Sequence, residues 1–204
     1  HLHVAHLSTA RAVAAVRDAR AAGARVTAEV TPHHLTLDAE AVARYGTLAK
    51  MNPPLRTAAD VAAVRSGLAD GTLEVIASDH APHHADEKAW GMEAAPFGIV
   101  GLETTVALVL ALVHAGVIPV LTAIRALTVG PAAALGIAAG RLANGSIADL
   151  TLIDPDMRWT VDPATFRSRS RNTPFTGMVM RGKALAVCLA GRVIDGDLEG
   201  RFTR

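Results

Sequence analysis

The chain has 204 residues, of which half are hydrophobic and 19% are charged, as is usual for a globular protein with one sizeable core. The formal net charge of +1 excludes a strongly basic nucleic-acid-binding protein and an acidic tail. The apolar stretch from Leu102 to Val113 is too short to span a membrane, and the single cysteine, Cys188, excludes an internal disulfide and fits a reducing cytoplasm.

Strands and helices are predicted to alternate along the first part of the chain. The opening segment His1-Leu2-His3 lacks an initiating Met and has the pattern of a buried strand, so we expect the chain to be part of something longer. Strands are predicted at Leu2 to Leu7, Arg25 to Val30 and Leu73 to Ser78. Helices are predicted at Ala10 to Ala22, Leu37 to Tyr45, Ala58 to Ala69, Leu102 to Ala115, Leu121 to Leu127 and Ala132 to Leu135. This alternation is typical of a parallel α/β layer.

The pattern changes after about Gly140. Short strands are predicted at Ala148 to Asp154, Gly177 to Arg181 and Ala184 to Ala190, with turn signals between them. The sequence therefore predicts a second, β-rich region.

Histidines gather where the three predicted strands of the first part end. Eight of the nine histidines lie in or beside three clusters there, namely His3 and His6, His33 and His34, and His80, His83 and His84 with Asp79. The C-terminal ends of parallel strands carry the active site in barrel folds of this class. Imidazole and carboxylate are zinc ligands, so the pattern favours a metal-assisted hydrolase.

Each cluster taken alone is weak. A single histidine at a strand end more often makes a structural hydrogen bond than a metal bond. Residues three apart on a strand face opposite sides, so at most one of His3 and His6 should point at a given site. The segment from Asp79 to Gly98 is long for a plain connection, which favours a functional loop. Asn52, in Lys50-Met51-Asn52-Pro53-Pro54, is equally a turn-forming residue of a Pro-rich loop and a residue that holds a substrate amide.

Eight motifs occur here in one order: HVAHLST, AEVTPHHL, KMNPPLR, SDHAPH, DEK, APFGIVGLET, ADLTLID and NTPFTG. This succession resembles the long-chain bacterial dihydroorotases of the amidohydrolase superfamily over essentially the whole chain. KMNPPLR, SDHAPH and PFGIVG are the most discriminating stretches, because hydantoinases and allantoinases usually differ in them.

The resemblance implies roles for particular residues. His6 matches a metal-binding histidine, and Asp79 matches an aspartate that both binds metal and transfers the proton. Asn52 and His83 match substrate-contacting residues, and Phe97-Gly98 matches a segment whose backbone holds the substrate. The reaction implied is reversible hydrolysis of the cyclic amide of dihydroorotate to N-carbamoyl-aspartate, in pyrimidine synthesis.

The resemblance also implies a fold and a cofactor. Residues 1–139 match the C-terminal portion of a (β/α)8 TIM-type barrel, about its last three strands, and residues 140–204 match part of a small β-sandwich domain. One or two zinc ions are implied. The family's Asp-x-His-x-His strand, a further carboxylate or modified lysine, another histidine and a substrate-binding arginine have no counterpart here, so this chain holds only a share of the metal site.

Three alternatives stay open. The first is a hydantoinase-like cyclic amidase that acts on another ring. The second is an inactive dihydroorotase-like protein that serves as a structural partner of aspartate carbamoyltransferase. The third is a truncated product without activity of its own. The small-molecule substrate and a homo-oligomer or aspartate carbamoyltransferase are the expected partners, and neither nucleic acid nor membrane is expected.

Overall fold

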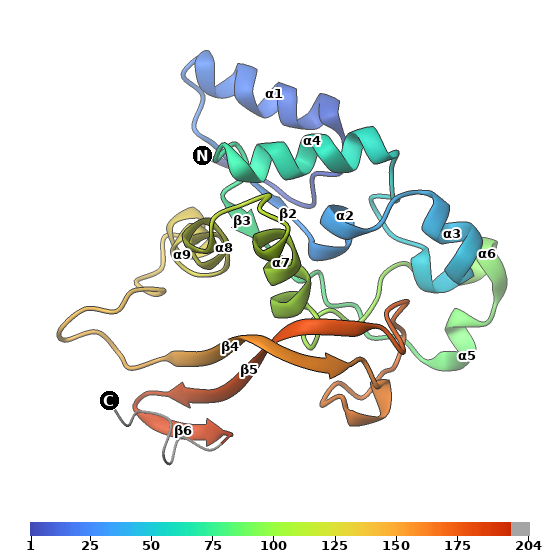
Figure 1. Cartoon of the computed structure of the whole chain (residues 1–204). Coiled ribbons are helices and arrows are strands. Elements are labelled where there is room, and N and C mark those ends of the chain that lie inside the picture. Colours follow the sequence, from blue (N-terminus) through green and yellow to red (C-terminus); the bar gives the residue numbers. More distant parts are fainter. Residues whose placement is uncertain (197–204) are drawn as a thin grey trace.

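The computed structural model describes residues 1–196 and contains two separate sheets (Figure 1). The first is parallel, in the order β1-β2-β3, and is built from β1 (Leu2–Val4), β2 (Val26–Val30) and β3 (Val75–Ile76). The predicted parallel α/β layer is confirmed. The strand predicted to continue to Leu7 stops at Val4, because the chain turns into a left-handed conformation at His6, with φ of 53°.

Helices α1 (Ala10–Ala21) and α4 (Ala58–Ala69) lie side by side and pack on this sheet (Figure 1). Both begin at a threonine whose hydroxyl accepts a hydrogen bond from a first-turn N–H group. The Asp60 carboxylate accepts a further bond from Ala10 N at 2.9 Å, which ties the two helix starts together. The core between these helices and the sheet includes Val13, Val30, Val64 and Leu68.

The segment after β2 differs from the prediction. Instead of one helix from Leu37 to Tyr45, the chain forms α2 (Pro32–Thr36), α3 (Glu40–Tyr45) and the 3-10 helix η1 (Gly46–Ala49). Thr31 caps α2, and proline is favoured in a first turn because its missing N–H needs no partner there. Thr31 and Pro32, which directly follow the strand predicted to end at Val30, are therefore the start of a helix.

The long segment after β3 is also more ordered than a plain loop, since it contains α5 (Ala85–Lys88) and α6 (Gly91–Ala94). It leads into α7 (Thr105–His114), α8 (Val120–Leu127) and α9 (Val129–Leu135), close to the predicted helices. No helix among residues 1–196 is long and apolar enough to cross a membrane.

The second sheet is antiparallel and lies apart from the first, on the other side of α7 (Figure 1). It consists of β4 (Leu150–Thr160), β5 (Val179–Leu189) and β6 (Arg192–Asp195), with the 3-10 helix η2 (Pro163–Thr165) after β4. The two short strands predicted around Arg181 and Ala184 are one strand, because Gly182, with φ of +99°, continues it in a conformation open to glycine. The predicted β-rich region is confirmed, and β6 was not predicted.

A second core lies between α7, the segments that follow β2 and β3, and the β-rich region. It is formed by buried side chains of α3, α7 and the β-rich region, with Leu37, Leu108, Val161 and Phe175 among them. This packing fixes the connection between β4 and β5 against α7 and the segment after β2.

Candidate active site

The ends of the three parallel strands bring His6, Glu29 and Asp79 to one edge of the sheet. His6 follows β1, Glu29 lies in β2, and Asp79 follows β3. Both His6 (φ 53°) and Asp79 (φ 48°) adopt left-handed backbone conformations. Such a conformation costs a non-glycine residue about 1–3 kcal/mol and is concentrated at functional sites. Both residues expected to bind metal thus carry this strain, which among the described non-glycine residues they share only with Ala190.

Glu29 joins the two histidines of the first cluster. Its buried carboxylate lies 3.0 Å from His3 Nε2 and 2.7 Å from His6 Nδ1, although the His6 contact lacks the angle of a hydrogen bond. At most one of His3 and His6 was expected to point at a given site, but both rings contact the Glu29 carboxylate, so this expectation is wrong there. The reason is that the strand alternation ends at Val4, before His6 is reached.

The second cluster lies directly beside Asp79. Nε2 of His33 is 3.7 Å from the Asp79 carboxylate and is buried without a hydrogen-bond partner. Burial, together with the positive charges of His34 and His6, holds the pKa of His33 well below its usual value. Burial raises the pKa of Asp79; the His6 charge opposes this and the Glu29 charge adds to it. A carboxyl group with a raised pKa is suited to accept and return a proton.

The segment from Lys50 to Arg56 lies beside these clusters. His34 Nε2 donates to Pro53 O at 2.9 Å, and Arg56 Nε donates to Ser8 Oγ at 3.4 Å. Asn52 itself is exposed. The side chain of Asn52 is therefore presented from a segment that is fixed next to both His34 and the chain after His6.

The remaining predicted residues form a third group, on the segment after β3. His83 Nε2 donates to Phe97 O at 2.9 Å, and Gly98 N donates to Lys50 O at 2.8 Å. The Phe97 ring is 51% exposed and lies 4.6 Å from the Lys50 ammonium. The structure thus brings His83, Phe97 and Gly98 together with the Lys50–Arg56 segment that carries Asn52.

The described residues hold part of a metal site only. No group of three or more histidine, cysteine or carboxylate side chains is arranged among residues 1–196 so that it could hold a metal ion. His6 and Asp79 nevertheless fit a share of such a site, because they provide imidazole and carboxylate at one sheet edge and Nδ1 of His6 has no hydrogen-bond partner.

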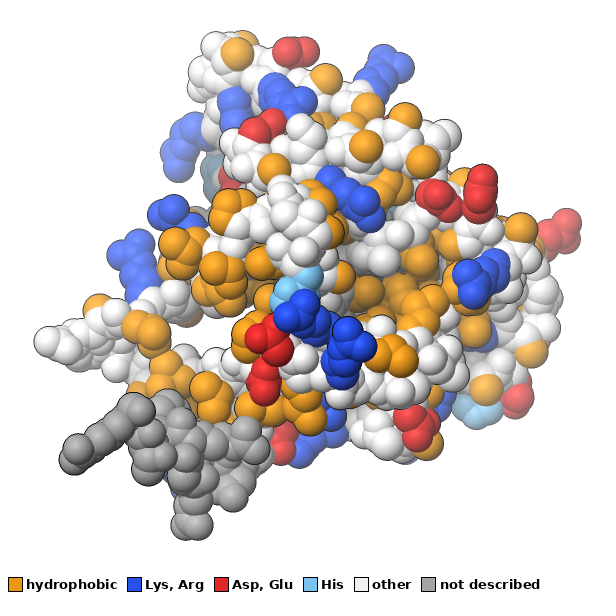
Figure 2. All heavy atoms as spheres, viewed as in Figure 1, with side chains coloured by type: hydrophobic (Ala, Val, Ile, Leu, Met, Phe, Trp, Pro, Cys, Tyr) orange, Lys and Arg blue, Asp and Glu red, His pale blue; other side chains and the backbone are white. Residues whose placement is uncertain are grey.

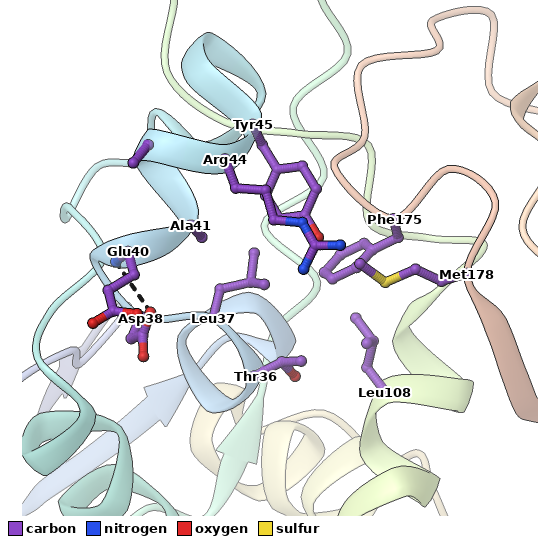
Figure 3. A pocket seen from close by; sticks show the side chains of 11 residues that line it. Thr36, Leu37, Asp38, Glu40, Ala41, Arg44, Tyr45, Leu108, Phe175 and Met178 are labelled. Atoms are coloured by element: carbon purple, nitrogen blue, oxygen red, sulfur yellow. Dashed lines mark hydrogen bonds between the residues drawn. The ribbon is translucent and has the colours of Figure 1, made fainter.

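A pocket of about 840 Å³ lies elsewhere, between α3, α7 and the segment that contains Phe175 (Figure 3). Arg44 and Tyr45 point into it above an apolar floor that includes Leu37. Hydrophobic side chains are also visible in a hollow of the surface in Figure 2. None of the predicted site residues lines this pocket, so we place the site at the strand ends, where the ionisable groups converge.

The residue pattern of the amidohydrolase family matches residues 1–194. The chain belongs to the amidohydrolase family.

Curated relatives of this amidohydrolase-family chain are dihydroorotases. It is 55% identical over 197 residues to the dihydroorotase of Pelotomaculum thermopropionicum, a match that covers 96% of this chain and 46% of that protein. It is 52% identical over 205 residues to the dihydroorotase of Anaeromyxobacter sp., covering 100% of this chain and 47% of that protein. The chain thus spans less than half the length of these relatives.

Solved structures show the same fold. The L-hydantoinase (dihydropyrimidinase) from Arthrobacter aurescens superposes with a TM-score of 0.91 at 30% identity, covering 95% of this chain and 44% of that one. The dihydropyrimidinase from Brevibacillus agri gives 0.90 at 27% identity, covering 96% and 45%. The α/β fold of this family member is therefore that of the hydantoinases, while its sequence is much nearer to the dihydroorotases.

Sequence reasoning missed three residues of the site. Glu29 contacts both His3 and His6, while Lys88 and Asn172 both contact Gly98 O. The motifs AEVTPHH, DEK and NTPFTG contain them, but only the tertiary structure shows what their side chains reach.

Proposed function

We propose that this chain forms the C-terminal part of a dihydroorotase. The reaction is the reversible hydrolysis of the cyclic amide of (S)-dihydroorotate to N-carbamoyl-L-aspartate in de novo pyrimidine synthesis. The observation that carries the proposal is the meeting of His6 and Asp79 at one sheet edge, in a chain 55% identical to a dihydroorotase over 96% of its length.

In this proposal His6 and Asp79 hold zinc, as one or two ions, together with ligands from the rest of the protein. When bound, zinc would polarise the ring carbonyl and lower the pKa of a bound water to about 7. Asp79 accepts the proton of the attacking water and delivers it to the ring nitrogen that leaves.

The other predicted residues hold the substrate. Asn52 is exposed on a segment fixed beside His34, and its amide can both donate to and accept from a ring amide. His83 and the Phe97-Gly98 segment contribute from the segment after β3, where the Phe97 N–H is the backbone donor left for the substrate because Gly98 N donates to Lys50 O. Positioning the ring between these groups lowers the entropic part of the barrier.

We further propose that residues 1–139 are the last part of a TIM-type barrel and that residues 140–204 belong to a β-sandwich domain. The open edges of the three-stranded parallel sheet support the first assignment. We also propose a cytoplasmic location, with a homo-oligomer or aspartate carbamoyltransferase as the partner.

The alternative of a hydantoinase-like activity is less well supported, because hydantoinases share the fold at only about 25–30% identity. The alternative of an inactive structural partner is countered by the chain's own residues. His6, Asp79, Asn52 and His83 are all retained, whereas inactive relatives would be expected to lose metal ligands.

A hybrid enzyme tests the proposal. This chain is joined to the part of the Pelotomaculum thermopropionicum dihydroorotase that it does not match, and ring opening is followed by ultraviolet absorbance. We expect turnover of dihydroorotate and little or none of hydantoin or dihydrouracil. A zinc-loaded hybrid that prefers hydantoin, or opens no ring at all, would refute it.

A further inference from the structure

Lys88 is a buried cation that the proposed chemistry does not use. It ends α5, its exposed fraction is 4%, and among residues 1–196 no carboxylate forms an ion pair with it. Its ammonium group donates instead to two backbone carbonyls, Pro96 O at 2.9 Å and Gly98 O at 3.1 Å. Burying a charge without a counter-ion is costly, so the energy must be balanced by the hydrogen bonds that it makes.

Asn172 reaches the same carbonyl from the β-rich region. It lies between β4 and β5 and is 4% exposed. Its amide group donates to Ala81 O at 2.9 Å and to Gly98 O at 3.2 Å, and its side-chain oxygen accepts from His83 N at 3.3 Å. The Asn172 side chain therefore connects the segment around His83 to the segment around Gly98.

These contacts leave the Gly98 peptide groups fully used. Its carbonyl accepts from Lys88 and Asn172, and its N–H donates to Lys50 O at 2.8 Å. By contrast, the Phe97 N–H has no hydrogen-bond partner among the described residues, and the Phe97 side chain is exposed. The Phe97 N–H is thus the free polar group of this segment, and the hydrogen bonds of the adjacent Gly98 hold it in place.

We propose that Lys88 and Asn172 are positioning residues that clamp the Gly98 carbonyl, so that the Phe97 N–H and His83 face the substrate at a fixed distance from each other. The inference rests on the proposed function, since it assigns these residues to the substrate site of that reaction. Neither residue touches the substrate in this account; both act through the segment from Pro96 to Gly98.

The charge of Lys88 supports the role. Burial and the nearby Lys50 lower the pKa of the Lys88 ammonium to about 8, so it is still mostly charged at neutral pH. A charged donor strengthens a hydrogen bond to a carbonyl roughly twofold. A purely apolar side chain would fill the same space at lower cost, but it could not fix two carbonyls.

The test uses the hybrid enzyme with Lys88→Met, Asn172→Ala and both together; Lys183→Met, at an exposed lysine far along the chain, is the matched control. Each of the first two variants should raise KM for dihydroorotate about tenfold, the value of one charge-assisted or shared hydrogen bond, with kcat within about threefold and zinc unchanged. The double variant should be little worse than the single ones, because both residues act on one carbonyl.

Cleavage by chymotrypsin after the exposed Phe97 gives a second readout that needs no activity. We expect faster cleavage in Lys88→Met and Asn172→Ala than in Lys183→Met. An unchanged KM in both variants, whether or not kcat falls, would overturn the positioning role. If Lys88→Met does not fold, Asn172→Ala decides by the same criteria. Failure of the unsubstituted hybrid to open dihydroorotate would count against the proposed function, while faster cleavage in the two variants would still support the clamp.

Discussion

Gly98 stands where the structure tolerates no side chain, and replacing it by alanine tests the geometry of the substrate segment. Its φ is +95°, and a Cβ atom added there would lie 2.5 Å from Ala81 Cβ. Ala81 belongs to the chain just after Asp79, and its carbonyl accepts from Asn172. Gly98→Ala should therefore push the segment around Gly98 away from the segment around Ala81, at the point where Phe97 and His83 meet.

The size of the effect follows from two separate costs. The positive φ costs an alanine about 1–2 kcal/mol, and the overpacking against Ala81 adds about 1–3 kcal/mol. Gly116→Ala is the matched control, because Gly116 has φ of +69° but nothing within 4 Å of the added Cβ. The control should lose only the first amount, about 1–2 kcal/mol.

Urea unfolding of the hybrid enzyme measures both costs, and KM for dihydroorotate measures the displacement of the segment. We expect Gly98→Ala to lose more stability than Gly116→Ala and to raise KM, which Gly116→Ala leaves unchanged. Adding Ala81→Gly should recover the overpacking part only. Equal losses in the two alanine variants, or no recovery from Ala81→Gly, would refute the close approach.

Three further expectations concern single residues of the hybrid enzyme. His6→Ala should lower the zinc retained after dialysis, measured by elemental analysis. His34→Ala should lower it much less, because the His34 ring is hydrogen-bonded to Thr31 and Pro53. Equal zinc loss in the two variants would mean that the wrong histidine is assigned as the ligand. Asn52→Ala should keep its zinc and raise KM for dihydroorotate, and an unchanged KM would remove Asn52 from the substrate site. The pKa of Lys88 is about 8 in the folded chain against an ordinary 10.5, so the unfolded chain binds more protons between these values and the free energy of unfolding should rise with pH across that window. Urea midpoints at both ends of the window should show this rise in the unsubstituted protein and a smaller one in Lys88→Met, and identical pH dependence would contradict the burial of the charge.

Local signals predicted the regular elements well. Helix α4 was predicted with its observed bounds, Ala58–Ala69, and Gly71 follows its end; the Thr57 cap is a finding of the structure. The parallel layer followed from the strand and helix alternation. The extent of β1 could not be predicted, since nothing local marks the left-handed turn at His6 that ends its alternation.

The candidate site was predicted only in part, for the same reason. The structure brings the histidine clusters predicted at the strand ends to one edge of the sheet, and the family motifs selected His6 and Asp79 within them. Glu29, Lys88 and Asn172 act across the fold, at sequence separations that no local pattern reports. Asn172, for example, contacts Ala81 O across 91 positions of the chain.

The most direct test of the account is Asp79→Asn in the hybrid enzyme, with zinc content and dihydroorotate turnover measured on the same sample. Asparagine keeps the size and one ligating oxygen of the side chain but cannot accept the proton. The account predicts appreciable zinc and a kcat lowered at least about a hundredfold, the lower bound for removal of a general acid–base group. Turnover near the unsubstituted rate with zinc bound would contradict the assignment of Asp79 as the proton-transfer group.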